Sequence, residues 1–302
     1  MDMLLPIRVD KRFLNLFKTV QIDTCPQQST LNLHILNIES NQFIYSKLVE
    51  ELRELIISYV HSNRRIEEFK QNYPAYSPKP FFEAIQKFRS YTSNEGELGE
   101  LLLYAFLEAG LNAPKLLSKM ELKTDSNDYI KGSDGVHLLE IDDSFQLIFG
   151  ESKLYADLLD GAREAFDSIV DFKANGMGFE RGLIDTHVIN EMVSEAGYEK
   201  IKEVLLPSGN NGPDLDLSFG IFLGFELPVD NSILALKTKE FREWVNESVK
   251  EHASRVVKTI QKKIINHGLF GHEFHIYIVP FTNIDITRKQ LIKDMLTIEG
   301  DS

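Results

Sequence analysis

The sequence predicts an α/β fold, and two arrangements of apolar runs in the 302-residue chain indicate it. Strand-like runs at 217–228 and 273–281 flank a long amphipathic segment at 237–269, which is typical of two parallel strands joined by a crossover helix. Two further strand-like runs, 137–141 and 145–150, are separated by turn residues and predict an antiparallel hairpin. Parallel and antiparallel pairs together predict a mixed sheet covered by helices.

Length and composition place the chain among ordinary globular proteins. The 302 residues are enough for one large domain, or for one domain with an appendage. Hydrophobic residues make up 43% of the chain and charged residues 26%. The single cysteine, Cys25, excludes an intrachain disulfide and fits a reducing, cytoplasmic compartment. We find no secretory leader, and no apolar run approaches the roughly 18 residues of a membrane span.

The formal net charge of the chain is −13. A protein that binds DNA alone usually carries a basic patch or stripe. The acidic balance therefore argues against strong autonomous binding to nucleic acid. It remains compatible with a local basic groove, with delivery to DNA by a partner, and with a simple contribution to solubility.

The N-terminal part of the chain mixes strand-like and helical patterns. A strand is expected at 31–36, and a helix at 43–59 has apolar residues at helical spacing. The segment 71–80 contains three prolines and predicts a linker or elbow, after which a helical pattern resumes over 81–90.

A strongly apolar helix is expected over 93–114, directly before the hairpin. Ser93 and Asn94 are candidate N-caps, and Gly110 and Pro114 are expected to end the helix. The remaining expected elements are an amphipathic helix at 156–174, a less clear helical stretch at 183–206, a loop at 208–216 and a C-terminal helix at about 286–297.

The register of the hairpin brings ionisable residues together. If the turn has two residues, Ile141 faces Ser144, and Asp134 then lies opposite Glu151 with Lys153 on the same face. A four-residue loop keeps this register. A three-residue loop would place the two carboxylates on opposite faces, so the length of the turn is the critical assumption.

Two neighbouring carboxylates repel one another unless a hard cation lies between them. Asp134 and Glu151 therefore predict a Mg²⁺ site, with Mn²⁺ as a substitute, at which Lys153 would assist hydrolysis of a phosphodiester. The preceding helix offers Glu97 and Glu100, three residues apart on one face, and either could supply a further ligand.

The Glu/Asp-x-Lys pattern alone has little specificity. It occurs at least four times, at 68–70, 121–123, 151–153 and 171–173. Only the pattern at 151–153 ends a strand that pairs with a run preceded by an acidic residue. The alternative interpretation of the same residues is a hairpin with a charged end that faces solvent.

A longer set of motifs resembles a known family. The runs "GELGELLLYAFLE", "SKMELKT", "IKGSDGVH" and "FGESKLY" are similar, in this order, to the HamA family of the Hachiman anti-phage defence system. The strongest similarity covers 96–169, and the chain length agrees with the family. The resemblance implies a divergent PD-(D/E)xK nuclease with a restriction-endonuclease-like core. One departure is Ser133, which stands where that superfamily has a proline.

The resemblance assigns roles residue by residue. Asp134 matches the motif aspartate, Glu151 and Lys153 match the (D/E)xK pair, and Glu97 or Glu100 matches the acid of the preceding helix. These five residues are the predicted catalytic set, and the four carboxylates among them are the predicted metal ligands.

The resemblance also implies an organisation and a partner. Residues 1–90 are expected to form an N-terminal α+β extension that could dock the partner, and residues 91–302 are expected to form the nuclease-like core. The implied partner is HamB, a superfamily 2 helicase, in a heterodimer that restrains the nuclease and brings it to DNA. The alternatives are a non-catalytic adaptor on the same fold and a nuclease directed at RNA.

Four other residues bear on these hypotheses. His137 is expected to be structural, Lys119 and Lys123 could contact a phosphate backbone or be solvated charges, and Tyr155 could line a groove or pack. The sequence contains no phosphate-binding lysine loop of an ATPase.

Overall fold

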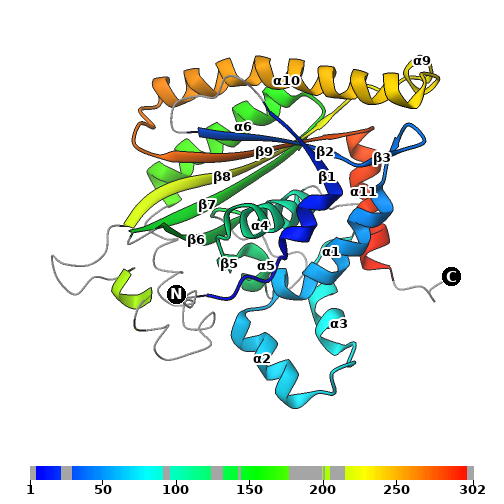
Figure 1. Cartoon of the computed structure of the whole chain (residues 1–302). Coiled ribbons are helices and arrows are strands. Elements are labelled where there is room, and N and C mark those ends of the chain that lie inside the picture. Colours follow the sequence, from blue (N-terminus) through cyan, green and yellow to red (C-terminus); the bar gives the residue numbers. More distant parts are fainter. Residues whose placement is uncertain are drawn as a thin grey trace.

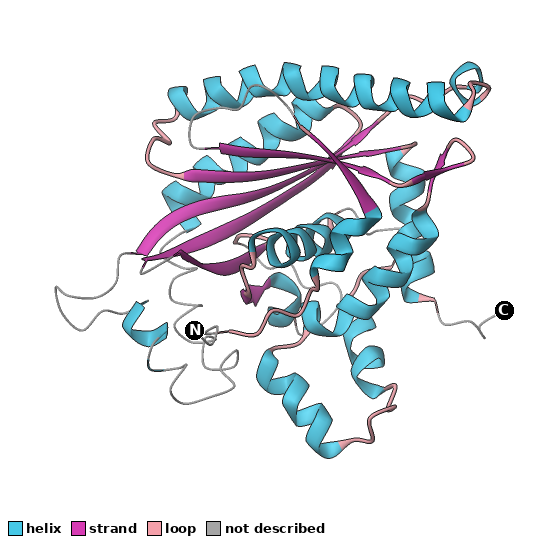
Figure 2. Cartoon of the chain, in the orientation of Figure 1, coloured by secondary structure: helices cyan, strands magenta, loops and turns pink. Residues whose placement is uncertain are grey.

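The computed structural model consists of a seven-stranded mixed sheet with helices on both faces (Figures 1 and 2). It describes residues 5–21, 29–90, 96–123, 132–141, 144–176, 199, 201–204 and 215–297. This architecture confirms the predicted α/β class with a mixed central sheet. Within the described residues, no helix is long and apolar enough to cross a membrane.

The strand order in the sheet is β1-β2-β9-β8-β7-β6-β5. The strands are β1 (Phe17–Val20), β2 (Ser29–Leu36), β5 (Lys115–Ser118), β6 (Gly135–Ile141), β7 (Ser144–Tyr155), β8 (Leu215–Glu226) and β9 (Glu273–Phe281). Strands β2, β9, β8 and β7 are parallel neighbours, whereas β1, β6 and β5 pair antiparallel at the two edges. A separate short hairpin consists of β3 (Ile38–Glu39) and β4 (Gln42–Phe43).

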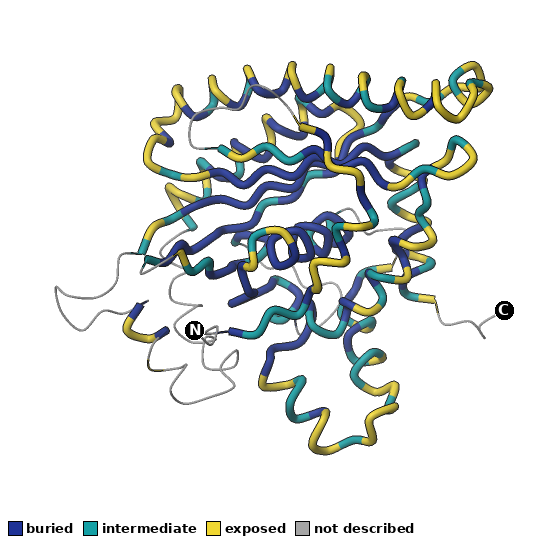
Figure 3. Tube along the Cα trace, viewed as in Figure 1, coloured by how far each residue is buried: buried dark blue, intermediate teal, exposed yellow. Residues whose placement is uncertain are grey.

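Helices cover both faces of the sheet. The α-helices are α1 (Tyr45–Val60), α2 (Asn63–Asn72), α3 (Lys79–Ile85), α4 (Glu97–Leu111), α5 (Lys119–Leu122), α6 (Leu158–Asp171), α9 (Asn231–Leu234), α10 (Thr238–Asn266) and α11 (Ile284–Leu296). A short 3₁₀-helix, η1 (Lys11–Leu16), and a short π-helix, η2 (Phe172–Gly176), are also present. Figure 1 shows α6 and α10 over one face and α4 against the other. In Figure 3 the outer side of α10 is exposed and its inner side is buried.

The predicted pairings are confirmed. Ile141 pairs with Ser144, and the same register continues to Val136 and Phe149. Helix α10 links β8 to β9, which are parallel, as the strand–helix–strand pattern predicts. The turn residues 142–143, the loop 208–216 up to residue 214, Cys25, and most of the expected helix at 183–206 lie outside the described residues.

The N-terminal segment contributes to the same sheet. Strand β2 pairs in parallel with β9, and β1 pairs antiparallel with β2 at the edge. The sheet therefore contains strands from both sides of the boundary expected at residue 90. A role of this segment in docking a partner remains a prediction.

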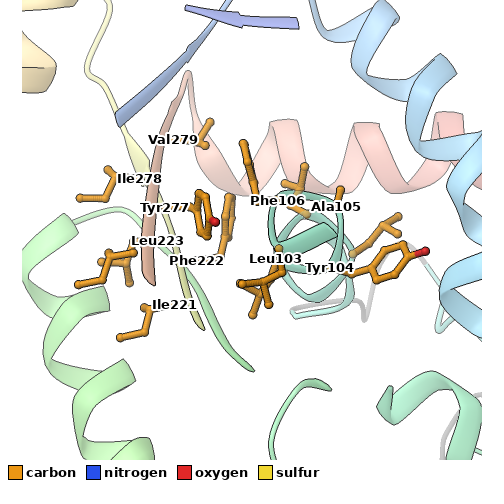
Figure 4. Close-up of a cluster of buried hydrophobic side chains, with 14 of the residues drawn as sticks. Leu103, Tyr104, Ala105, Phe106, Ile221, Phe222, Leu223, Tyr277, Ile278 and Val279 are labelled. Carbon is orange, nitrogen blue, oxygen red and sulfur yellow. The ribbon is translucent and has the colours of Figure 1, made fainter. Parts of the chain in front are cut away.

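Helix α4 is the centre of the core. An ordinary surface helix has one apolar stripe, but α4 is buried on nearly all sides, which its almost continuous apolar sequence requires. Phe106 faces the sheet and stacks on Phe222 and Tyr277, with ring centroids 6.0 Å and 5.0 Å apart (Figure 4). Tyr104 points to the opposite side of the helix.

The expected ends of α4 need one correction. The candidate caps Ser93 and Asn94 lie outside the described residues, and the described helix begins at Glu97. Gly110 does not end the helix. Asn112 does so, with a φ of 55° in the left-handed region, which asparagine tolerates better than most residues. Gly110 instead packs beside the ring of Tyr277.

Gly99 allows α4 to approach β7 closely. A Cβ atom at this position would lie 2.4 Å from Leu154 Cδ1 and 3.1 Å from Ser152 Oγ. Contacts this short require the neighbouring side chains to move. The missing side chain therefore lets the first turn of α4 lie against the C-terminal part of β7.

We expect Gly99→Ala to lower the free energy of unfolding by about 1–3 kcal/mol, because the added methyl group overpacks this contact. Gly110→Ala is the control in the same helix. Its Cβ would meet Tyr277 Oη at 3.3 Å, so its effect should stay below about 1 kcal/mol in either direction. Denaturant unfolding measures both, and equal stabilities of the two variants would contradict the close approach at Gly99.

The buried His34 makes stability depend on pH. Burial lowers the pKa of His34 from 6.5 to about 4, since the ring lies against Phe106 and Tyr277. Between these values the unfolded chain binds a proton that the folded chain does not, so stability falls as pH drops from about 6.5 to about 4.

Between pH 6.5 and pH 4, we expect His34→Phe to lose up to about 3 kcal/mol less of its free energy of unfolding than wild type, because the replacement ring does not titrate. The control is Thr19→Val, which removes the hydroxyl partner of His34 but no titrating group. Urea unfolding at pH 7 and pH 4.5 measures the difference. If His34→Phe leaves the dependence unchanged, the histidine is not the group responsible.

Candidate active site

Four of the five predicted site residues meet at the point where the pairing between β6 and β7 stops. An open pocket of about 1000 Å³ lies there, and its walls come from α4, α5, the bend before β6, β7, α6 with the adjoining η2, and α11. The ionisable residues that line it include Glu100 of α4, Lys119 of α5, Asp134 before β6, and Glu151 and Lys153 of β7. Helix α11 contributes Arg288.

Asp134 is fixed by four hydrogen bonds. Its backbone N–H donates to Gly150 O at 2.8 Å, and its Oδ2 accepts from Ser152 N and Ser152 Oγ at 2.7 and 2.8 Å. Its Oδ1 accepts from Lys119 Nζ at 2.7 Å. Burial alone would raise the pKa of Asp134, but the Lys119 ammonium and the Ser152 donors outweigh it and lower the pKa, so the carboxylate stays ionised.

The position of Asp134 differs in detail from a simple continuation of the hairpin. The ladder ends at the pair Val136–Phe149, and Asp134 lies in a bend before β6. Because β6 ends there, the Ser152 N–H has no strand partner on that side and binds the Asp134 carboxylate instead. Asp134 and Glu151 still line the same pocket, although Asp134 leans toward Ser152.

Glu151 and Lys153 form an ion pair within the pocket. Lys153 Nζ lies 2.8 Å from Glu151 Oε1, and both side chains are partly buried. Burial is the main reason that the pKa of Glu151 is raised to about 7, and the negative charge of Asp134 adds to the effect. Lys153 faces α6, since its Cβ lies near Gly161, so alternation along β7 places Ser152 toward α4.

The structure separates the two glutamates of α4. Glu97 is turned away from the pocket lining: its Oε1 pairs with Lys123 and its Oε2 accepts from Arg89 N at 3.0 Å. Glu100 lines the pocket and accepts a hydrogen bond from Tyr59 Oη at 3.1 Å. Burial and the charge of Asp134 raise the pKa of Glu100 to about 7.

Several site residues were not identified from the sequence. Tyr59 reaches Glu100 from α1, and its helical spacing in the sequence indicates only a core position. Ser152 sits inside the Glu-x-Lys motif, where any residue is allowed. Lys119 was expected to be a phosphate contact or a solvated charge, but it contacts Asp134. Burial would lower the pKa of Lys119, yet the Asp134 and Glu100 carboxylates outweigh it and keep the amine charged.

Three other expectations can be compared with the structure. Lys123 is buried against Glu97 rather than placed to meet a phosphate backbone. His137 is buried and its Nδ1–H donates to Ala113 O at 2.8 Å, which fits the expected structural role. Tyr155 lines the pocket and is partly exposed.

The donor set fits a hard divalent cation in its chemistry. Four carboxylates line the pocket, and three of them, Glu100, Asp134 and Glu151, are predicted site residues. Asp134 Oδ1 and Glu151 Oε1 each hold a lysine ammonium, so positive charge is already accommodated at these oxygens. The carboxylates do not form a ready-made cage. Across the described parts of the chain, no three Asp, Glu, His or Cys side chains are grouped closely enough to hold a metal ion together. Metal binding would therefore need side-chain rotation.

A comparison with known families identifies the chain. A family model described as HamA matches residues 11–295, so the chain belongs to the HamA family. This membership supports a role in anti-phage defence. A search of the curated proteins found no match.

The two glutamates of α4 should respond differently to substitution. Glu97→Gln should lower the free energy of unfolding by about 1–3 kcal/mol, because it leaves the buried Lys123 without its countercharge. Glu100→Gln should leave stability unchanged or raise it, since it removes a charge beside Asp134 and keeps an oxygen that Tyr59 can bind. Urea unfolding in EDTA at pH 8 measures both, and a larger loss in Glu100→Gln would contradict this division of roles.

Proposed function

We propose that this HamA-family chain is a metal-dependent nuclease that cuts DNA in anti-phage defence. The observation that carries the proposal is the meeting of Asp134, Glu151, Lys153 and Glu100 in one pocket. These residues come from α4, from the bend before β6 and from β7, and they match the acids and the lysine that the family resemblance assigns.

Each residue has a role in this proposal. Asp134, Glu151 and Glu100 would supply the carboxylate oxygens that hold Mg²⁺ or Mn²⁺. A bound Mg²⁺ would polarise the phosphodiester and lower the pKa of an attacking water. Lys153 remains charged, because Glu151 and Asp134 raise its pKa against the effect of burial, and it would offset charge that develops on the phosphate. Ser152 holds Asp134 in place, and Tyr59 holds Glu100.

The proposal includes a partner. With a formal net charge of −13, the chain has little general attraction for DNA, so a superfamily 2 helicase, HamB, would supply the affinity and control access. Docking of the helicase on the N-terminal segment would act on the site through Tyr59 of α1, whose hydroxyl donates a hydrogen bond to Glu100.

A second candidate is a non-catalytic adaptor that docks the helicase and cuts nothing. The observation in its favour is that Asp134 and Glu151 each hold a lysine, and that the described residues contain no ready-made group of three metal ligands. An adaptor predicts that the pocket residues can be replaced without loss of defence.

We expect the chain to cut duplex DNA in Mg²⁺ when the cognate helicase and ATP are present. Glu151→Gln and Lys153→Met should each reduce the rate by about 100-fold or more, because the first removes a charged metal ligand and the second removes the ammonium that offsets charge on the reacting phosphate. The control is Glu68→Gln, which changes another Glu-x-Lys pattern on the exposed face of α2. EDTA should abolish cutting. Gel assays of linear and circular DNA measure these rates.

The outcomes separate the alternatives. Equal cutting by wild type and Glu151→Gln would place the chemistry elsewhere. An intact substrate, after complex formation and helicase activity have been verified, would favour the adaptor. Cutting of single-stranded or duplex RNA but not of DNA would assign the enzyme to RNA.

A further inference from the structure

Lys119 belongs neither to the Glu-x-Lys motif nor to the residues of the proposed mechanism, yet it contacts a carboxylate of the same site. Lys119 is the first residue of α5, and its Nζ lies 2.7 Å from Asp134 Oδ1. Its side chain is 21% exposed and lines the open pocket. Glu100 and Glu151 line the same pocket, so one ammonium group faces all three carboxylates of the site.

The hydrogen bonds of Asp134 determine what Lys119 blocks. Oδ2 is already taken by the N–H and the hydroxyl of Ser152, which belong to the sheet framework. Oδ1 is therefore the oxygen through which Asp134 can bind a cation in the pocket, and Lys119 occupies it. A divalent cation would lie about 2.1 Å from that oxygen. It would then overlap the ammonium group or lie against it with strong repulsion.

The backbone of Lys119 is held while its side chain can rotate. Ser118 caps α5 by accepting from Glu121 N, and its hydroxyl donates to Tyr59 O at 2.9 Å. A displacement of Lys119 from Asp134 therefore needs only rotation about the side-chain bonds, and no rearrangement of the helix. Three carboxylates facing one partly buried pocket without a cation would be costly, so the amine has a clear role in the metal-free protein.

We propose that Lys119 is the resident countercharge of the metal-free site, and that it leaves Asp134 when a divalent cation binds. This inference rests on the proposed metal site and adds a residue that sets its affinity. The ion pair between Lys119 and Asp134 and the bound cation exclude one another, so Lys119 raises the metal concentration at which the site fills. Because the ion pair must break before the metal binds, metal binding is weaker by the free energy of that ion pair.

The test is a calorimetric titration of the full chain with Mn²⁺, without DNA or helicase. Lys119→Met should bind Mn²⁺ about tenfold more tightly than wild type, a change of about 1.4 kcal/mol. Lys119→Gln should show the same tightening, and it can still donate to Asp134 if the methionine variant fails to fold. Glu151→Gln should weaken binding. Lys70→Met is the control, since Lys70 forms an exposed ion pair with Glu67 on α2.

A second readout follows thermal unfolding. In EDTA, Lys119→Met should be less stable than wild type, and Mn²⁺ should raise its melting temperature more than it raises that of wild type. Binding to Lys119→Met and Lys119→Gln that equals or falls below wild-type binding overturns the proposal. If wild-type binding then still depends on Glu151, the metal site stands without the role of Lys119. If neither Lys119 variant binds Mn²⁺, the countercharge and the proposed metal site fail together.

Discussion

The hydrogen bonds between Asp134 and Ser152 are the interaction on which the arrangement of the site depends. Toward the start of β6, the residue pairs between β6 and β7 end at Val136 and Phe149. Beyond Phe149, β7 continues and remains paired with β8 on its other edge. The N–H of Ser152 would be left without a partner at this point. Asp134 Oδ2 accepts the hydrogen bond from this N–H, and Asp134 Oδ1 accepts from Lys119 in the pocket. The end of a strand thereby fixes the position of a carboxylate at the pocket, and the same contact satisfies a backbone N–H.

Helix α4 completes the arrangement from the other side of the sheet. Its interior residues form the core, so the helix is held rigidly. The absence of a side chain at Gly99 allows its first turn to pack against Ser152 and Leu154. Glu100 reaches the pocket as a consequence, whereas Glu97, nearly a turn earlier, is bound to Lys123. A site whose acids project from rigid, buried elements keeps their relative positions better than one built on loops. The donor hydroxyl of Tyr59 links this acid to the N-terminal helix α1.

Much of the fold and part of the site could be predicted from the sequence, for physical reasons that differ. The hairpin register follows from the assumption that two residues separate the strands, and it agrees with the pairing of Ile141 and Ser144. The choice between Glu97 and Glu100 could not be predicted, since both lie on one helical face and only the tertiary partner Lys123 distinguishes them. The roles of Tyr59 and Lys119 also escape the sequence. Their contacts cross 41 and 15 residues of chain. Lys119 lies in the run "SKMELKT", but that motif does not show which carboxylate the lysine meets.

The charges in the pocket bear on whether it is a functional site or a structural one. A cluster of three carboxylates and two lysines, partly removed from water, contributes little to stability, and apolar residues of similar size would pack there at lower cost. The buried sides of α6 and α10 follow the opposite rule, since their buried residues are apolar throughout. The contrast supports a chemical role for the pocket. Two of these three carboxylates are already offset by a lysine, so a cation would have to displace or outweigh an ion pair to enter. If the pocket holds a metal as proposed, these ion pairs set the metal concentration at which it fills.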